Sequence, residues 1–391
     1  MTEHEIIIIG GGISGLSLAH YCSKRGLRPL VIEKENRIGG TFYTYSKDSF
    51  WFELGAHTCY NSYGNLVDLL NETGLLGRIV KPGKAGYRLF SNGAIETLTS
   101  QLNFPELLVS LPRFFSAKPE GETVESYYSK VVGKRNFERV VGPLFSAVIC
   151  QRANDFPADM LFKKRVRRRE VIKKFTLPGG IQTITDAIAA EPGIVTVRGK
   201  EVKEISYSSG VFTVLAVDGS NFESRKLALA TPSGTAAAVL SKSFPNLSKI
   251  LAAIGAEKVE TLGVIVRKDA VKLPAIAALA ASQGNFYSFV SRDTFPDAVF
   301  RGFAFHFRAG AVSYEAKLDS IRSVLGTGDF EHIVTAEHVI PSLRLGHKEV
   351  IREIDGLIAG IPLLLTGNYF TGLAIEDCLS RSRQEFNRLG P

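Results

Sequence analysis

The 391-residue chain has little of what metal and disulfide chemistry require. Its four cysteines, Cys22, Cys59, Cys150 and Cys378, do not show the C-x-x-C spacing of a metal or redox pair. Its histidines include no H-x-x-x-H pair, so the sequence predicts no metal site. We therefore expect four reduced thiols in a cytoplasmic protein.

The sequence also lacks an apolar run long enough to span a membrane, which takes about 20 residues. Two uncharged stretches, 273–291 and 356–375, are interrupted by proline and glycine. The apolar run near the start follows MTEHE, which has two acidic residues where a signal peptide carries positive charge. We expect neither export nor a spanning helix.

A nucleic-acid-binding module is likewise absent, although the net charge is +8. Much of the excess lies in KKRVRRREVIKK, Lys163 to Lys174. Such a run is often a solvated face, but it could also attract an anionic membrane surface or a substrate that bears carboxylates. We expect no nucleic-acid partner and keep peripheral membrane contact through this segment as a hypothesis.

What the sequence does contain is a glycine-rich turn close to its start, IIIIGGGISGLSLA. The β-branched run Ile6–Ile9 is typical of a parallel strand buried on both faces. Gly10, Gly12 and Gly15 then form G-x-G-x-x-G, which allows a tight turn, close approach of a pyrophosphate, and close packing of helix on strand. The helix that begins near Ser14 would direct its free N–H groups at the phosphates.

A second apolar run, 29–32, ends in Glu33, where a carboxylate can accept hydrogen bonds from ribose hydroxyls. The residues from Glu33 to Thr41 continue as E-x-x-x-R-x-G-G-T. This extension resembles that of FAD proteins of the glutathione-reductase type. The branch it resembles contains flavin amine oxidases, protoporphyrinogen oxidases and phytoene desaturases.

Further segments resemble that branch in the order in which it uses them. They are FELGAHT (52–58), LPGGIQTITDAIA (177–189), GKEVKEI (199–205), LALATPS (227–233), IPSLRLGHKEV (340–350) and TGNYFTGLAIEDCLSRS (366–382). The last two are similar to segments of protoporphyrinogen oxidases. The resemblance implies FAD as cofactor, with contacts at Gly10, Gly12, Ile13, Ser14, Gly15, Glu33, Lys34, Arg37, Gly39, Gly40, Thr41, Gly55, Ala56, His57, Val202, Thr231, Gly367, Asn368, Gly372, Leu373 and Ala374.

The implied fold is α/β, with α+β character overall. A Rossmann-type FAD domain would be discontinuous, at 1–85, 176–240 and 335–391. A mixed α+β substrate domain, from 86–175 and 241–334, would lie over the flavin, and the cleft between the domains is the expected active site.

Within the substrate domain, helical patterns are broken by Pro105, Pro112 and Pro143. The alternation of Phe303, Phe305 and Phe307 predicts a strand whose aromatic face belongs to the core rather than to a substrate wall.

The resemblance implies transfer of a hydride from substrate to flavin, with oxygen or another acceptor completing the cycle. A helix that begins near Leu373 would direct its positive end at the flavin ring. His57 is the one candidate acid or base.

Several substrates stay open. We favour a protoporphyrinogen oxidase-like enzyme that acts on a planar, largely apolar substrate. A carotenoid-type desaturase, a flavin amine oxidase and a redox-neutral sugar-nucleotide mutase are alternatives, as is a protein that binds FAD or a tetrapyrrole without turnover. The amine reading is weakened because only Tyr369 and Phe370 lie where an aromatic cage is expected, and Trp51 is the only tryptophan.

Overall fold

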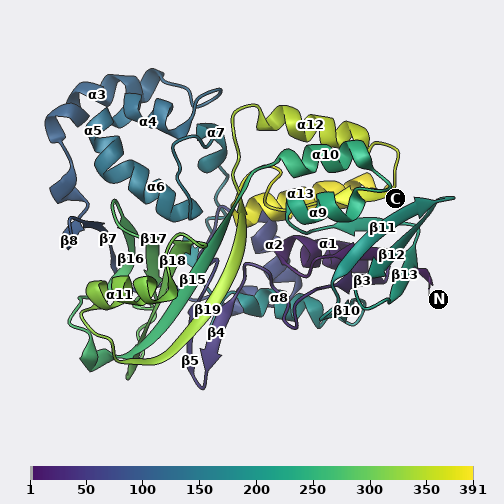
Figure 1. The fold of residues 1–391 in the computed structure, drawn as a ribbon, viewed down its shortest axis with the longest axis horizontal. Helices are drawn as coiled ribbons and strands as arrows, with labels where there is room; N and C mark the ends of the chain where they lie inside the picture. Colours follow the sequence, from purple (N-terminus) through teal and green to yellow (C-terminus); the bar gives the residue numbers. More distant parts are fainter. Residues whose placement is uncertain (1–2, 391) are drawn as a thin grey trace.

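A five-stranded parallel sheet forms the centre of the molecule in the computed structural model, which describes residues 3–390 (Figure 1). Its strand order is β10-β3-β2-β14-β20, and each neighbouring pair is parallel. The strands are β10 (Val195–Val197), β3 (Pro29–Ile32), β2 (Ile6–Ile9), β14 (Leu227–Leu229) and β20 (Leu363–Leu365). The chain leaves β2 toward β3 on one side and returns beside it as β14, so the carboxyl ends of β2 and β14 form the crevice where ligands bind in such sheets.

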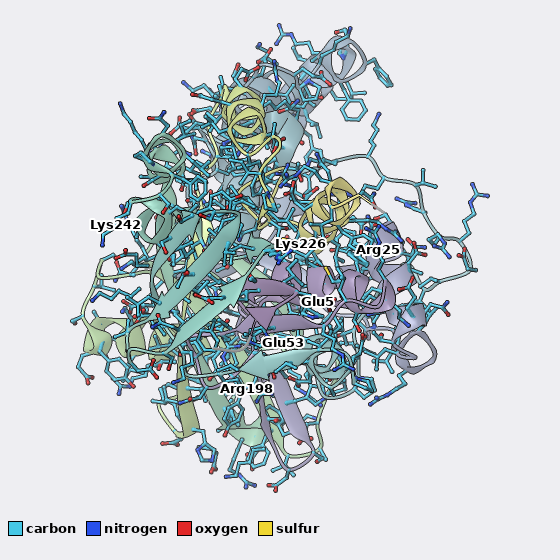
Figure 2. All side chains as sticks on the ribbon, turned by 90° about the vertical axis from the view of Figure 1, so that its right-hand side faces the viewer. Glu5, Arg25, Glu53, Arg198, Lys226 and Lys242 are labelled. Carbon is cyan, nitrogen blue, oxygen red and sulfur yellow. The ribbon has the colours of Figure 1, made fainter. Side chains whose placement is uncertain are left out.

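The two faces of this sheet are covered by different layers because successive strand residues point to opposite sides. Ile6 and Ile8 pack in a core with helices α1 (Ile13–Lys24), α2 (Gly64–Glu72), α8 (Gln182–Ala189) and α13 (Ile375–Arg388). Ile7 and Ile9 pack in a second core with α9 (Ser233–Leu240), α10 (Pro245–Ala253), α12 (His347–Leu357) and a small sheet. That sheet has the order β1 (Glu3–His4), β13 (Asn221–Ser224), β12 (Val211–Ala216), β11 (Val202–Ser208). Figure 2 looks at the end of the molecule where it lies, with Lys226 and Lys242 beside it.

A seven-stranded sheet carries the second part of the molecule. Its order is β19 (Phe330–Pro341), β15 (Ala256–Arg267), β18 (Phe300–Arg308), β17 (Phe286–Ser291), β16 (Ile276–Ala281), β7 (Gly86–Ser91), β8 (Ala94–Thr97). Helix α11 (Tyr314–Leu325) shares a core with this sheet that includes Phe303, Phe305 and Phe307, all fully buried. The predicted core role of this aromatic face is confirmed.

The hairpin β4 (Thr44–Lys47) and β5 (Phe50–Glu53) packs on the other side of that sheet. Phe52 lies so close that a Cβ at Gly263 or Gly302 would approach its ring within 3.0 Å. Glycine at these two strand positions is what allows the hairpin to bring the segment after β5 against the long strands β15 and β19.

A lobe of helices stands beside β7 and β16 (Figure 1). It contains α3 (Phe104–Ser116), α4 (Val124–Val132), α5 (Lys134–Asn136), a π-helical turn (Phe137–Val141), α6 (Gly142–Ile149) and α7 (Ala158–Leu161). Short 3₁₀ turns lie at Leu76–Arg78, Thr99–Gln101 and Lys268–Ala270, and β6 (Cys59–Tyr60) pairs with β9 (Lys174–Phe175). Within residues 3–390 no helix is long and apolar enough to cross a membrane.

Three details differ from the sequence-based expectation. Pro112 lies inside α3, so the proline does not end that helix. Helix α10, expected in the substrate domain, packs against α9 in the core of the parallel sheet because Leu247 and Leu251 are buried there. Strand β19 continues to Pro341, six residues past the boundary expected at 335, because it pairs with β15 along most of its length. The domain limits themselves stay a prediction.

Candidate functional site

The turn after β2 is folded as tightly as its glycines allow. Gly10 has φ +108°, and a Cβ there would lie 2.6 Å from the carbonyl oxygen of Ala230 at the end of β14. A Cβ on Gly15 would lie 2.0 Å from the carbonyl oxygen of Gly10. Side chains at these two positions are therefore excluded, and the turn brings the start of α1 directly against the crevice between β2 and β14.

Helix α1 begins at the wall of this crevice with Gly12 as its extended N-cap. The first-turn N–H groups of such a helix have no partner within the helix, and none of its first-turn side chains is acidic. Gly12 forms a parallel bridge to Gly39, whose N–H donates to the carbonyl of Gly11 at 2.8 Å. The turn therefore holds free donors around a concave surface that can accept an anion.

Glu33 closes one side of the crevice. Its carboxylate accepts the Gly11 N–H at 2.7 Å through Oε2 and the Glu35 N–H at 2.9 Å through Oε1. A carboxylate has about four acceptor positions, so capacity for two ribose hydroxyls remains. The two backbone bonds also fix the orientation of a side chain that is 9% exposed.

Arg37 is held by the backbone that follows it. Its guanidinium donates to the carbonyl of Gly40 at 2.7 Å and to that of Ile38 at 3.2 Å, and it lies 3.9 Å above the ring of Tyr43. Burial lowers the pKa of Arg37, and nearby Tyr43 and acidic groups oppose that shift. The side chain thus fixes the G-G-T turn while its charge stays beside the crevice.

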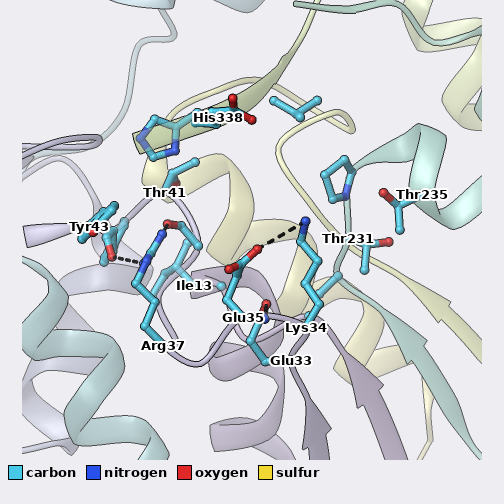
Figure 3. Close-up of a pocket in the computed structure, with 18 of the residues that line it drawn as sticks. Ile13, Glu33, Lys34, Glu35, Arg37, Thr41, Tyr43, Thr231, Thr235 and His338 are labelled. Carbon is cyan, nitrogen blue, oxygen red and sulfur yellow. Dashed lines mark hydrogen bonds and ion pairs between the residues drawn. The ribbon is translucent and has the colours of Figure 1, made fainter. Parts of the chain in front are cut away.

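A cavity of about 1130 Å³ extends from this turn to strands β15 and β19. Figure 3 shows His338 and Thr41 on one side of it and Thr231 and Thr235 on the other, with Glu33 and Lys34 between them. The volume exceeds the about 300–1,000 Å³ of ordinary small-molecule pockets, as an extended dinucleotide requires.

Most of the predicted contacts are brought together at this cavity. Those that line it are Gly10, Gly12, Ile13, Ser14, Glu33, Lys34, Arg37, Gly40, Thr41, Ala56, Val202, Thr231, Gly367, Asn368 and Leu373. Those that do not line it are Gly15, Gly39, Gly55, His57, Gly372 and Ala374.

Several residues of this second group lie in the layer behind the wall of the cavity, where they determine how closely the backbone packs. A Cβ on Gly55 would lie 2.2 Å from the carbonyl of Thr41, and one on Gly372 would lie 2.5 Å from the Asp377 carboxylate. Ala374 is the N-cap of α13, whose Asp377 side chain accepts the Ala374 N–H at 3.3 Å. Direct FAD contact by each predicted residue stays a prediction.

His57 lines a small pocket that is separate from this cavity. Its side chain is exposed and lines this pocket. Its Nδ1 lies 2.8 Å from the Thr58 hydroxyl. Burial, with a contribution from the charge of Lys174, lowers the pKa of His57 to about 4, so the imidazole is neutral at pH 7 and can accept a proton.

Two more buried histidines lie on strands β18 and β19. His306 Nδ1 lies 2.9 Å from the Thr261 hydroxyl, and His338 Nε2 lies 3.0 Å from the carbonyl of Leu54. Burial lowers the pKa of both, that of His306 to about 3. Among residues 3–390, no group of three His, Cys, Asp or Glu side chains is placed to hold a metal ion.

Sequence reasoning missed the contribution of β15 and β19 to the cavity. These strands supply Glu260, Thr261 and Leu262, and Thr335 to Val339. Their sequences read as ordinary strands, and only pairing over a long antiparallel register brings Thr261 opposite Ala336. The one available signal was IPSLRLGHKEV, which begins where β19 ends.

Tyr369 and Phe370 do not form a cage over the cavity. Both are 1% exposed and belong to the core under the parallel sheet, and the guanidinium of Arg381 lies 3.9 Å above the ring of Phe370. The C-terminal loop therefore supplies structure rather than an aromatic pocket for an amine.

The site fits FAD on its own features. Thr231 carries a buried hydroxyl with no partner among the described residues, and it lines the cavity beside the free donors of α1. Thr231 lies within ATPS, the segment for which a cofactor contact was expected. The turn of Gly10 and Gly12, with Glu33 and Arg37, would hold the pyrophosphate and the ribose.

The site combines a nucleotide-binding turn at the crevice of a parallel sheet with a cavity that extends to a second sheet. This is the arrangement of FAD-dependent oxidoreductases. The family model of flavin containing amine oxidoreductases matches residues 13–266. The chain therefore belongs to this family, and FAD is its cofactor.

Individual relatives are distant. The 15-cis-phytoene desaturase of Narcissus pseudonarcissus is 30% identical over 105 residues, which are 27% of this chain and 18% of that protein. A structure from Exiguobacterium sp. 255-15, assigned provisionally as a protoporphyrinogen oxidase, has TM-score 0.81 at 15% identity and covers 100% of this chain and 99% of its own. The fatty acid isomerase of P. acnes that produces CLA has TM-score 0.76 at 15% identity and covers 99% of each chain. The two structures establish likeness of fold.

Proposed function

We propose that the chain oxidises a planar, largely apolar substrate that carries carboxylates, in the manner of a protoporphyrinogen oxidase. The observation that carries the proposal is a recess of about 640 Å³ lined by Lys81, Lys84, Lys173 and Lys174. Four cations at one mouth attract an anionic ligand and repel an amine. We therefore place the carboxylates of the substrate in this recess.

The recess continues into the small pocket that holds His57. The two share Pro82, Lys174, Ala277 and Thr294. Beyond them, the small pocket is lined by Phe52 and Phe295, and by the buried Thr176, whose hydroxyl has no partner among the described residues. A ligand with acidic ends and an apolar body would meet the surfaces in this order, and because the small pocket holds only about 50 Å³, its side chains must move apart to admit the apolar body.

The residues of the pocket support one assignment of roles to the cofactor and to His57. FAD, when bound, accepts the hydride that the substrate loses. His57 is neutral at pH 7 and takes the proton that is released with it. Lys174 disfavours protonation of His57 before substrate arrives, and its ammonium, which donates to the Tyr87 hydroxyl at 2.9 Å, fixes one side of the pocket.

A polyene desaturase is the second candidate, favoured by the stretch that is similar to phytoene desaturase. An amine oxidase fits the family, but the lysine-lined recess and the buried Tyr369 and Phe370 give it no support. A protein that binds FAD and a tetrapyrrole without turnover would share the same surfaces.

The test is an anaerobic visible spectrum of the flavin-loaded protein before and after addition of protoporphyrinogen, phytoene in liposomes, or putrescine. We expect the oxidised flavin band to bleach with protoporphyrinogen alone, and porphyrin fluorescence to rise only after oxygen is admitted, because porphyrin formation removes six electrons and one flavin accepts two. The double variant Lys81→Ala, Lys84→Ala should slow bleaching at low substrate and leave the flavin spectrum unchanged. Bleaching by phytoene or putrescine alone would refute the proposal, and porphyrin binding with an unbleached flavin would identify a carrier.

A further inference from the structure

Helix α3 turns an apolar stripe to the outside of the molecule. Phe104, Leu108, Leu111 and Phe115 recur at helical spacing, so they share one face. Their exposed fractions are 53%, 67%, 44% and 81%, whereas an amphipathic helix of a globular protein normally buries such a face. Ser110, on the opposite side, is the only buried residue of the helix.

The polar side of α3 is fastened to the lobe, which fixes the stripe outward. Glu106 accepts the backbone N–H of Arg135 at 3.1 Å and that of Asn136 at 3.2 Å. Asn103 caps the helix by accepting the Glu106 N–H at 3.0 Å, and its own carbonyl accepts from the Asn136 amide at 3.0 Å. The helix cannot turn its apolar face inward without the loss of these bonds.

The positive charge of this region comes from the chain that follows the lobe. Residues 86–162 contain eight Lys and Arg and eight Asp and Glu, whereas residues 163–175 contain eight Lys and Arg and one Glu, which is nearly all of the net charge of +8. Arg113 and Lys118, on and just after α3, are exposed, and neither has an ion-pair partner among the described residues.

The basic segment Lys163–Lys174 divides into two parts. Lys163 and Arg165 form ion pairs with Asp377 at 3.0 and 2.8 Å, and Arg168 pairs with Asp68 at 2.7 Å, so these three cations hold the segment on α13 and α2. The exposed cations without ion-pair partners in the described chain are Lys164, Arg167, Arg169 and Lys173.

Neighbouring residues extend the apolar surface toward this segment. Phe162, 50% exposed, packs on Phe145 of α6, which packs on Tyr128 of α4, the helix that contacts α3. Val166, within the basic segment, is 88% exposed. Exposed apolar side chains thus continue from the end of the lobe into the basic segment.

We propose that the α3 stripe and these cations form a docking surface for an anionic lipid membrane. The phenylalanines and leucines enter the boundary between headgroups and acyl chains, and the free Arg and Lys side chains contact anionic headgroups. A second copy of the chain would bring two Lys163–Lys174 segments together, so the charge of this segment favours the membrane over self-association. The proposal rests on the surface alone and holds whatever the flavin oxidises.

The experiment is co-sedimentation of the flavin-loaded full chain with vesicles of phosphatidylcholine, with or without an equal part of phosphatidylglycerol. We expect binding to the anionic vesicles, weakened by salt, and little binding to phosphatidylcholine alone. Leu108→Ser with Phe115→Ser should reduce binding at least about tenfold. Arg167→Gln with Arg169→Gln should reduce it by about fivefold for each charge.

The matched control is Val217→Ser, a valine 61% exposed in the other part of the molecule, and it should bind as the wild type does. Equal binding by the α3 double variant, or equal binding to both vesicles, would overturn the proposal. A dimer that dissociates in the α3 variant, without vesicle binding by the wild type, would also overturn it. If the double variant loses its flavin, Phe115→Trp provides the test: its emission should shift to the blue with anionic vesicles, and no shift overturns the proposal.

Discussion

Glu53 is a buried carboxyl whose ionisation should limit stability in alkaline solution. It is 7% exposed, accepts the Thr44 hydroxyl at 2.6 Å and the Ile181 N–H at 2.8 Å, and has no cation partner among the described residues. Burial raises the pKa of Glu53 from 4.5 to about 8, even though these two hydrogen bonds lower it. The side chain is thus expected to be protonated in the folded protein at neutral pH.

The sign of the effect follows from the two pKa values. Below pH 4.5 the carboxyl is neutral in the folded and unfolded chains, so its contribution to stability is fully present. Between pH 4.5 and about 8 only the unfolded chain loses the proton, so stability falls by about 1.4 kcal/mol for each pH unit. Above that range the loss is constant at roughly 5 kcal/mol, an upper limit for a group that can recruit water.

Glu53→Gln removes this titration and keeps the shape of the side chain. The free energy of unfolding of the variant, minus that of the wild type, should rise by several kcal/mol from about pH 5 to about pH 8. Urea unfolding at saturating FAD measures it, with Glu331→Gln, an exposed glutamate on β19, as the control. A difference that does not change with pH would refute the reasoning.

Four substitutions test other parts of the site. Gly12→Ala should fold normally, because the nearest atom to the new Cβ is 3.8 Å away, but should purify without the visible flavin band since the methyl stands at the cavity wall. Gly15→Ala should instead lower Tm, because its Cβ would lie 2.0 Å from a backbone oxygen. His57→Asn should slow flavin reduction by about a hundredfold or more. In the wild type, the rate of flavin reduction should show no titration of His57 between pH 6 and pH 8, because its pKa is about 4. Arg381→Met should cost about 1.5–3 kcal/mol in urea unfolding because it removes one of the two guanidinium groups, those of Arg381 and Arg388, that lie 2.8 Å from the buried Glu385 carboxylate; no measurable loss would contradict this.

The cofactor cradle could be predicted from the sequence because its requirements are local. Glycine at position 15 is forced by a close contact with Gly10, five residues earlier, and Glu33 ends the strand that follows the first helix. Each requirement therefore appears as a residue type at a fixed spacing. The same holds for β20 and α13, because a strand, a loop and a helix follow one another directly between residues 363 and 388.

The substrate side could not be predicted in the same way, because it is made by long-range pairing. The recess is lined by Lys81 and Lys84 from one part of the chain and by Lys173 and Lys174 from another. These parts are held together by an isolated bridge between Val80 and Thr176, which no local sequence pattern predicts. The exposed stripe of α3 has the same periodicity as a buried one, so the sequence predicts the helix but not the side on which solvent lies.

The basic segment shows why a run of charge is ambiguous until its partners are known. Lys163 and Arg165 form ion pairs with Asp377 in the first turn of α13, whereas Arg167 and Arg169, in the same run, are exposed and have no ion-pair partner among the described residues. Lys173, at its end, lines the recess in which we place the carboxylates of the substrate. One segment thus contacts the wall of the cofactor site, the proposed membrane surface and the mouth of the substrate recess. Because binding to a membrane would bring that recess close to a substrate held in the membrane, such a substrate in anionic vesicles should reduce the flavin at a lower total concentration than the same substrate in detergent.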